Sequence, residues 1–297
     1  MAQPFRHVAI FGKPRAEGIR APLEAIARIV AQRDLVPMFD AATRDQVGLT
    51  EYAGHSIETI GERADVAVVL GGDGTLLGIA RELSRHSIPL IGINHGRLGF
   101  MTDIALDQMP EVLGTMLDGH YEMDRRAMLE SCILRAGTAV FQARAVNDVV
   151  VTRGSTGGMV EFTVRVDGVT MYNQRADGLI LATPTGSTAY ALSANGPILH
   201  PSLAGMVLVP VAPQTLSNRP IALPDSVVLE IEITDEREAA AHFDMQSFSL
   251  LAPGDIVRAQ RSSDEIALLH PVGYNYFATL RQKLHWNFMP SEPHARG

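Results

Sequence analysis

Up to about residue 120, the apolar positions of the chain follow two alternating patterns. Short and almost entirely apolar runs, typical of strands buried on both faces of a sheet, occupy 7–12, 36–39, 65–70 and 88–93. Apolar residues that recur every three or four positions predict helices over 19–33, 76–86 and 106–117. Segment 50–60 fits neither pattern. Strands that alternate with helices predict an α/β domain with a parallel, Rossmann-like sheet.

The pattern changes after Tyr121, where polar and apolar residues begin to alternate. Segments 160–166 and 227–233 have this period of two, and Asp167-Gly168 is a hairpin-turn signal. Segments of this kind, separated by glycine, proline, serine and asparagine, predict layered antiparallel sheets. The charged and small stretch 235–241 is expected to form a solvated turn or a hairpin tip.

The length of 297 residues suits two domains of ordinary size. We expect an N-terminal α/β domain over 1–124 and an all-β domain over 125–272. The net charge of −8, without long basic runs, argues against a general nucleic-acid binder. The single cysteine, Cys132, is expected to be buried and suits a reducing compartment, and neither a signal-peptide pattern nor a membrane-length apolar run is found. We therefore expect a soluble cytoplasmic protein with no nucleic-acid or membrane partner.

The most informative stretch is 70–75, Leu-Gly-Gly-Asp-Gly-Thr, which joins a predicted strand to a predicted helix. Glycines let the backbone turn tightly and approach a ligand, and the N–H groups of a helix start favour anions. The stretch therefore predicts a phosphate-binding corner. Asp73 would repel a phosphate unless a metal ion lies between them or the carboxylate takes a proton, and both exceptions are catalytic or cofactor roles. The alternative is that Asp73 or Thr75 caps the helix.

A second glycine-rich stretch, 94–100, follows the predicted strand 88–93. Both glycine-rich stretches lie at the carboxyl ends of predicted parallel strands, which is where ligands bind in sheets of this kind. Arg97 is either a phosphate contact or a solvent-facing side chain.

Three polar clusters interrupt the apolar runs of the β half: Asn147-Asp148, 175–178 and 183–190. Each lies at the edge of a run that should be buried, where polar groups must be paired or must contact a ligand. Segment 183–190 has four aliphatic hydroxyls, which suit phosphate or ribose oxygens, and Tyr190, which can stack on a base. It lacks the lysine of a Walker loop. For each cluster, ordinary turn chemistry is the alternative.

Five motifs, taken in order, resemble the bacterial NAD kinase family over nearly the whole chain. They are Gly71-Gly72-Asp73-Gly74-Thr75, the stretch 92–100, Asn147-Asp148, Asp177-Gly178 and segment 183–190. The glycine–aspartate motif alone is shared with diacylglycerol and sphingosine kinases and with phosphofructokinases, so the ordered set carries the resemblance. It implies ATP-dependent phosphorylation of the 2′-hydroxyl of the adenosine ribose of NAD, which gives NADP.

The same resemblance implies a divalent metal ion, Mg²⁺ or Mn²⁺, with ATP as the phosphoryl donor. It implies a homo-oligomer, either a dimer or a tetramer. It also implies that the final segment, 273–297, packs back on the N-terminal domain. It identifies no metal ligands in this chain.

Residue roles follow from the resemblance in the same way. Asp73 resembles the family's general base for the 2′-hydroxyl, and Gly74 resembles the NAD contact beside it. Asn147 and Asp148 resemble the pair that binds an adenosine moiety. The other expected NAD contacts are Arg175, Asp177, Gln246 and one continuous segment, Thr188, Ala189, Tyr190, Ala191, Leu192 and Ser193.

The chain departs from many relatives at two positions. Asp148 stands where many have glutamate, and Gly158 cannot supply the larger contact side chain that some place there. Two other classes stay open: a lipid or sugar kinase with the same glycine–aspartate motif, and a dehydrogenase or non-catalytic NAD-binding module. Against a dehydrogenase, Gly72-x-Gly74-x-x-x-Gly78 has one spacer too many for the Rossmann fingerprint, and the next strand ends at Asn94 instead of an acid.

Overall fold

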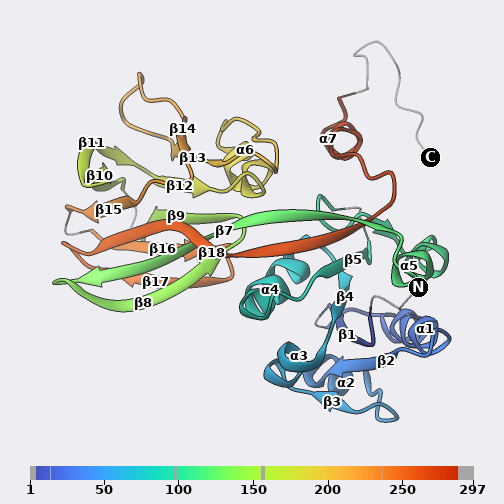
Figure 1. The fold of residues 1–297 in the computed structure, drawn as a ribbon. Helices are drawn as coiled ribbons and strands as arrows, with labels where there is room; N and C mark the ends of the chain where they lie inside the picture. Colours follow the sequence, from blue (N-terminus) through green and yellow to red (C-terminus); the bar gives the residue numbers. More distant parts are fainter. Residues whose placement is uncertain (1–4, 14, 97–98, 155–157, 236, 287–297) are drawn as a thin grey trace. The chain divides into compact units, whose positions relative to one another are not determined.

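A computed structural model of the chain describes residues 5–13, 15–96, 99–154, 158–235 and 237–286 (Figure 1). The chain divides into two compact units. One consists of Met1–Asp124 and Ala267–Gly297, and the other of Arg125–Ile266. Two long strands, β7 (Tyr121–Arg135) and β18 (Ile256–Pro271), contribute residues to both units.

The first unit contains a sheet built on parallel strand pairs, as the alternating pattern predicts. Its strand order is β3-β2-β1-β4-β5, followed by the end of β18, which pairs with β5 through Leu268 and Leu90. A short strand, β6, also pairs with β5. The strands are β1 (His7–Gly12), β2 (Val36–Asp40), β3 (Gly54–His55), β4 (Val66–Gly71), β5 (Leu90–Asn94) and β6 (Ile104–Ala105).

Helices cover both faces of this sheet, with α1 and α5 on one side and α3 and α4 on the other (Figure 1). The apolar face of α1 buries Leu23, Ile26 and Val30 against strand residues such as Val8 and Val68, as its helical spacing requires. The helices are α1 (Arg20–Ala31), α2 (Ala41–Val47), α3 (Ile57–Arg63), α4 (Asp73–Leu83), α5 (Met109–Leu117) and α7 (Tyr276–Leu284), with a 3₁₀ turn at Ser84–His86.

Segment 50–60, which fits neither pattern in the sequence, contains β3 and the start of α3. Ser56 is the N-cap of α3, and its side chain accepts a hydrogen bond from the backbone of Thr59. A two-residue strand and a helix of seven residues are too short to give a clear period.

The second unit contains two antiparallel sheets. A six-stranded sheet has the order β14 (Ile221–Pro224), β13 (Gly205–Val211), β12 (Gly178–Ala182), β9 (Asp148–Arg153), β16 (Ala239–Phe243) and β17 (Ser247–Leu251). The other sheet has the order β11 (Val169–Ala176), β10 (Val160–Val166), β15 (Leu229–Ile233), β18 and β7, with β8 (Thr138–Ala145) paired to β7.

Alternating side chains of both sheets form one apolar core, which includes Val149 and Leu181 of the first sheet and Phe162 and Ile231 of the second. The layered antiparallel prediction is therefore confirmed. The expected hairpin turn joins β10 to β11 at Asp167 and Gly168, which both have positive φ, 49° and 76°.

Three expectations about single segments are wrong. Stretch 235–241 is not entirely a turn, because Ala239 to Ala241 lie buried in β16, paired with β9 and β17. Alanine shows no alternation in the sequence, so this strand has no visible period. The helix predicted from Leu76 begins earlier, at Asp73. Cys132 is half-buried instead of fully buried, and burial raises the pKa of its thiol.

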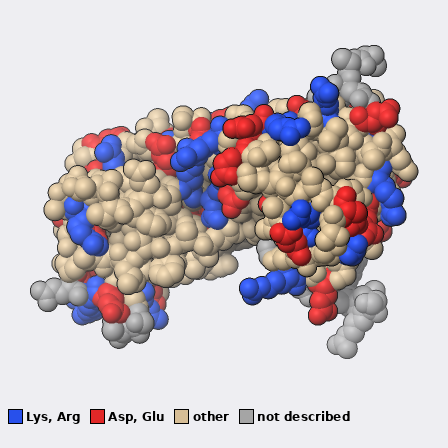
Figure 2. Space-filling view, turned by 90° about the horizontal axis from the view of Figure 1, so that it is seen from below, with Lys and Arg blue, Asp and Glu red and all other residues tan. Residues whose placement is uncertain are grey.

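Acidic and basic side chains are interspersed on the surface shown in Figure 2. Several of them form ion pairs, such as Arg33 with Asp118 at 2.9 Å in the first unit and Arg165 with Glu232 at 2.7 Å in the second. Among the described residues, the helices are all too short or too polar to cross a bilayer.

Candidate active site

The glycine corner of the first unit forms where β4 ends and α4 begins. β4 ends at Gly71, and Gly72 is the N-cap of α4, so no side chain caps the helix. A Cβ atom on Gly71 would lie 2.7 Å from Oγ1 of Thr75, so the corner requires glycine there. A helix start capped by a bare backbone leaves room for an anion at its N-terminus.

Asp73 lies in the first turn of α4 and does not cap the helix, so the capping alternative is wrong. Its carboxylate instead accepts hydrogen bonds from three consecutive backbone N–H groups, which begin at the last residue of the second glycine-rich stretch and continue just beyond it. Oδ2 accepts from Phe100 at 2.7 Å, and Oδ1 accepts from Met101 and Thr102, both at 3.1 Å. The Thr102 hydroxyl also donates to Oδ1, at 3.0 Å. The two glycine-rich stretches are therefore joined through Asp73.

This junction explains the second glycine of stretch 94–100. A Cβ atom on Gly99 would overlap Oδ1 of Asp73, so a larger residue would push the carboxylate away. Asn94 supports the same arrangement, because its side-chain amide donates to the Thr102 hydroxyl at 3.0 Å. Lys283 of α7 lies over the ring of Phe100, 5.6 Å from its centroid. Arg97 lies outside the described residues.

A cavity of about 810 Å³ opens beside this junction, at the carboxyl end of β5. Its lining includes Asn94, Gly96, Asp103, Gln108 and Gln282, and does not include Asp73. The position agrees with the expectation that ligands bind at the carboxyl ends of parallel strands. Amide and carboxyl side chains make the cavity suitable for a polar ligand.

In the second unit, Asp244 holds the start of β9. Its carboxylate accepts hydrogen bonds from the backbone of Val146 at 2.9 Å, Asn147 at 2.7 Å and Asp148 at 3.1 Å. Asp244 lies in the turn between β16 and β17, where its φ is 51°. Asp244 stands two residues before Gln246, and its structural role was missed because the three N–H groups lie about a hundred residues away in the chain.

Asp148 is a buried carboxyl group, 2% exposed. Burial, and after it the negative charge of Asp244, raises the pKa of Asp148 to about 7. Its Oδ1 atom is buried and has no hydrogen-bond partner among the described residues. A buried polar atom without a partner is costly, so this oxygen is suited to a ligand that donates a hydrogen bond.

Segment 183–190 packs directly against Asn147. The backbone N–H of Thr183 donates to the carbonyl of Asn147 at 2.9 Å. A Cβ atom on Gly186 would overlap the same carbonyl, so this position requires glycine. The segment continues as a 3₁₀ turn at Gly186–Thr188 and a short helix, α6 (Tyr190–Ser193). The structure therefore brings Asn147, Asp148 and the segment that carries Thr188 to Ser193 together.

The four hydroxyls of this segment all have partners within the protein. Thr183 donates to the carbonyl of Val146, and Ser187 and Thr188 donate to carbonyls of their own segment. The hydroxyl of Thr185 accepts from Arg126 at 3.3 Å. Their first role is therefore to fix the fold of the segment, in addition to any contact with a ligand.

Arg175 and Asp177 lie apart from this group. Gly178, next to Asp177, pairs with Thr152, whereas Ala182, at the other end of β12, pairs with Asp148. Four residues of strand span about 13 Å. The side chain of Arg175 binds Glu161 at 2.7 Å, and Asp177 lies 3.6 Å from Arg153. Within the second unit, the structure does not bring these two residues to Asn147 and Asp148.

Two solved structures have this fold over most of their length. A yeast NADH kinase, solved with NADH, aligns with a TM-score of 0.87 and 22% identity over 100% of this chain and 91% of its own. An NAD kinase from Archaeoglobus fulgidus, solved with ATP, aligns with a TM-score of 0.75 and 24% identity over 94% and 98% of the two chains. These likenesses establish the fold: a parallel α/β unit and a layered antiparallel β unit.

The sequence comparisons define the family. Residues 24–121 match the model of the ATP-NAD kinase N-terminal domain, and residues 146–270 match that of the ATP-NAD kinase C-terminal domain. An NAD kinase from Cupriavidus pinatubonensis is 56% identical over 97% of this chain and 95% of its own, and one from Ralstonia nicotianae is 53% identical over 97% and 96%. The chain belongs to the ATP-NAD kinase family, whose members are enzymes that phosphorylate NAD. The family prediction is confirmed, and the lipid-kinase and non-catalytic alternatives are set aside.

The part of the chain that the structure describes contains no group of three or more His, Cys, Asp or Glu residues placed to hold a metal ion. Mg²⁺ in nucleotide sites takes most of its ligands from phosphates and water. A divalent ion bound with the nucleotide would therefore take most of its ligands from the phosphates and from water.

Proposed function

We propose that this protein transfers the γ-phosphoryl group of ATP to the 2′-hydroxyl of the adenosine ribose of NAD, with Asp73 as the general base. The products are NADP and ADP. The observation that carries the proposal is the placement of Asp73. Three backbone N–H groups hold its carboxylate at the start of α4, where no side chain caps the helix. Phosphoryl transfer depends mostly on positioning and charge stabilisation, which this arrangement supports.

The two carboxylate oxygens of Asp73 are not equivalent. Oδ1 accepts three hydrogen bonds, whereas Oδ2 accepts one, from Phe100. A carboxylate oxygen has room for a second hydrogen bond, so Oδ2 is the atom that can receive the proton of a ribose hydroxyl. A well-placed base of this kind contributes about 10²–10⁴-fold to a rate.

The glycine corner beside Asp73 supports binding of the phosphates. Gly72 puts no side chain over the N-terminus of α4, where the helix dipole favours negative charge. The nucleotide enters as its complex with a divalent ion, and the ion offsets phosphate charge.

In the second unit, Asn147 and Asp148 are suited to an adenosine moiety. Oδ1 of Asp148 is buried without a partner among the described residues, so it can accept a hydrogen bond from an amino or hydroxyl group of the ligand. Segment 183–190 is packed on Asn147, so the neighbouring residues Thr188 to Ser193 border the same group. Gln246 follows the Asp244 turn that holds both residues. These placements support the NAD contacts that the resemblance implies for this part of the chain.

The test measures NADP formed from NAD, ATP and Mg²⁺ by the wild type and by the Asp73→Asn variant. We expect Asp73→Asn to keep the KM for NAD and to lose most of kcat, by about 10²–10⁴-fold, because the amide cannot take the proton. The control is Asp118→Asn, which changes a surface aspartate of the same unit that pairs with Arg33. Near wild-type turnover by Asp73→Asn would contradict the base role, and absence of NADP from the wild type would contradict the activity itself.

A further inference from the structure

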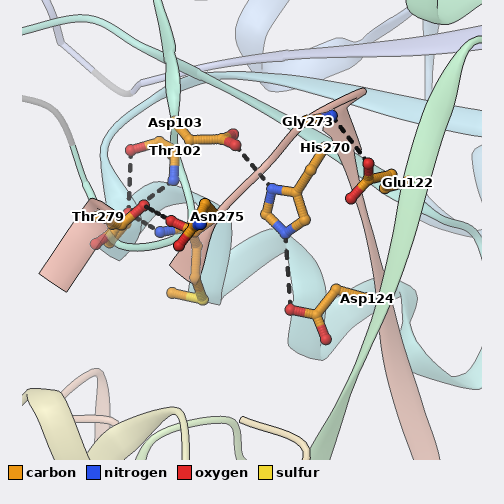
Figure 3. Close-up of polar contacts among 10 residues, drawn as sticks. Thr102, Asp103, Glu122, Asp124, His270, Gly273, Asn275 and Thr279 are labelled. Atoms are coloured by element: carbon orange, nitrogen blue, oxygen red, sulfur yellow. Dashed lines mark hydrogen bonds and ion pairs between the residues drawn. The ribbon is translucent and has the colours of Figure 1, made fainter. Parts of the chain in front are cut away.

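A buried histidine of the first unit lies between two aspartates, outside the corner described above (Figure 3). His270, near the end of β18, is 1% exposed. Its Nδ1 atom lies 2.8 Å from Oδ2 of Asp103, and its Nε2 atom lies 3.8 Å from Oδ2 of Asp124. The ring of Tyr274 stacks on the imidazole, with centroids 3.8 Å apart and planes at 8°. We call these four residues the His270 cluster.

The bond between His270 and Asp103 fixes the orientation of the imidazole. At 2.8 Å, Nδ1 donates to the carboxylate of Asp103, whereas 3.8 Å from Nε2 to Asp124 is too long for a hydrogen bond. The other oxygen of Asp103, Oδ1, is buried and has no hydrogen-bond partner among the described residues. His270 is therefore the hydrogen-bond donor that holds this side chain in place.

Asp103 directly follows Thr102, which makes two hydrogen bonds to Asp73. Thr102 donates to Oδ1 of Asp73 through both its backbone N–H and its hydroxyl. The turn formed by residues 99–103 is thus anchored at one end by the carboxylate of Asp73 and at the other by the imidazole of His270. Figure 3 shows Thr102 and Asp103 side by side, with Asp103 directed toward His270.

We infer that His270 is a positioning residue for Asp73 and acts through Asp103 and Thr102. Without the imidazole, the carboxylate of Asp103, whose Oδ1 atom is buried without a partner among the described residues, loses its hydrogen-bond donor and must turn to find another. Because Thr102 is the adjacent residue, that movement shifts the N–H and hydroxyl groups that orient Asp73. A displacement of about 1 Å in a reacting group can cost 10²-fold in rate. The inference rests on the proposed role of Asp73.

The main variant is His270→Phe, which keeps the stacking on Tyr274 and the buried volume but removes Nδ1. We expect kcat for NADP formation to fall about 10–100-fold, with the KM for NAD and for ATP changed less than about threefold, because only the orientation of Asp73 is lost. His270→Asn, whose amide can donate near the position of Nδ1, is expected to recover most of the loss. Asp103→Asn tests the same bond from its other partner and serves if His270→Phe does not fold.

A double-mutant comparison distinguishes a positioning role of His270 from a purely structural one. In the Asp73→Asn background, His270→Phe should lower the residual kcat by less than about threefold, because residues that act as a unit are not additive. Equal losses in both backgrounds, an unchanged kcat in folded His270→Phe, or a rise in KM alone would each overturn the inference. If Asp73→Asn loses turnover but His270→Phe does not, the base role stands and only the inference fails.

Discussion

Asp73 in the first unit and Asp244 in the second use the same device. Each carboxylate accepts hydrogen bonds from the backbone N–H groups of three consecutive residues, 100–102 for Asp73 and 146–148 for Asp244. Each thereby fixes a polar stretch that the sequence marks as a candidate site. A single carboxylate can hold a whole turn in this way because its two oxygens offer several acceptor positions.

Asp73 and Asp244 differ in how exposed their side chains are and in which groups lie next to them. Asp73 is half-buried at the start of α4, next to the glycine corner, so a ligand can reach it. Asp244 is 7% exposed, and its charge lies near the buried carboxyl group of Asp148. The same bonding pattern therefore suits a reacting group in one unit and a structural support in the other. Hydrogen-bond pattern alone does not distinguish a catalytic carboxylate from a structural one.

The largest effect expected to separate the two aspartates is a loss of stability in the Asp244→Ala variant. It leaves three backbone N–H groups of residues 146–148 without their acceptor, and most of this backbone is buried. At about 1–3 kcal/mol for each buried donor left unsatisfied, the free energy of unfolding should fall by several kcal/mol. Urea or thermal unfolding checks this.

Two matched variants sharpen the Asp244→Ala experiment. Asp244→Asn keeps Oδ1, which accepts from Asn147 and Asp148, and should cost less. Glu161→Ala, which breaks an exposed ion pair with Arg175 in the same unit, should lower the free energy of unfolding only slightly, because solvent screens exposed pairs. If Asp244→Ala unfolds no more easily than Glu161→Ala, Asp244 is not a support.

The second effect is a loss of turnover, and it concerns Asp73. In Gly99→Ala, the added methyl group would overlap Oδ1 of Asp73, so the carboxylate or its turn must move. We expect kcat for NADP formation to fall by about 10²-fold, with a smaller change in thermal stability than in Asp244→Ala. Combined with Asp73→Asn, Gly99→Ala should lower kcat little further. A Gly99→Ala variant with wild-type kcat would mean that the turn does not set the position of Asp73.

Much of this fold could be predicted because its signals are local. The parallel α/β unit follows from apolar runs that alternate with helical spacing, and the hairpin at Asp167 follows from one dipeptide. The strand at Ala239 could not be predicted, because three alanines have no alternation and are buried only by pairing with β9 and β17. The expected homo-oligomer and cytoplasmic location stay predictions.

Residues of the candidate site stand out in the sequence where motifs mark them, and they were missed where their contacts are long-range. Gly72, Asp73 and Asn147 stand in recognisable stretches of the sequence. Asp244 and His270 are isolated polar residues whose partners lie far away in the chain, so nothing nearby in the sequence marks their roles. The separation of Asp177 from Asp148 depends on the register of β12, which no local pattern sets.

The smallest expected effect, taken per pH unit, tests the pKa of Asp148 through the pH dependence of stability. A carboxyl group with a pKa of about 7 in the folded protein, and about 4 when unfolded, binds more protons in the folded state between these values. The free energy of unfolding therefore falls as pH rises from about 4 to 7, by at most about 1.4 kcal/mol for each pH unit. Asp148→Asn, which does not titrate, should lose this part of the pH dependence.

Asp244→Asn links this measurement to the comparison of the two aspartates. Removing the charge of Asp244 removes one of the two causes that raise the pKa of Asp148, so the fall in stability should end at a lower pH than in the wild type. Unfolding by urea at a series of pH values gives all three profiles. If Asp148→Asn and the wild type have parallel profiles between pH 4 and 7, the carboxyl group of Asp148 is ionised in the folded protein at neutral pH, and the charge of Asp244 does not raise its pKa.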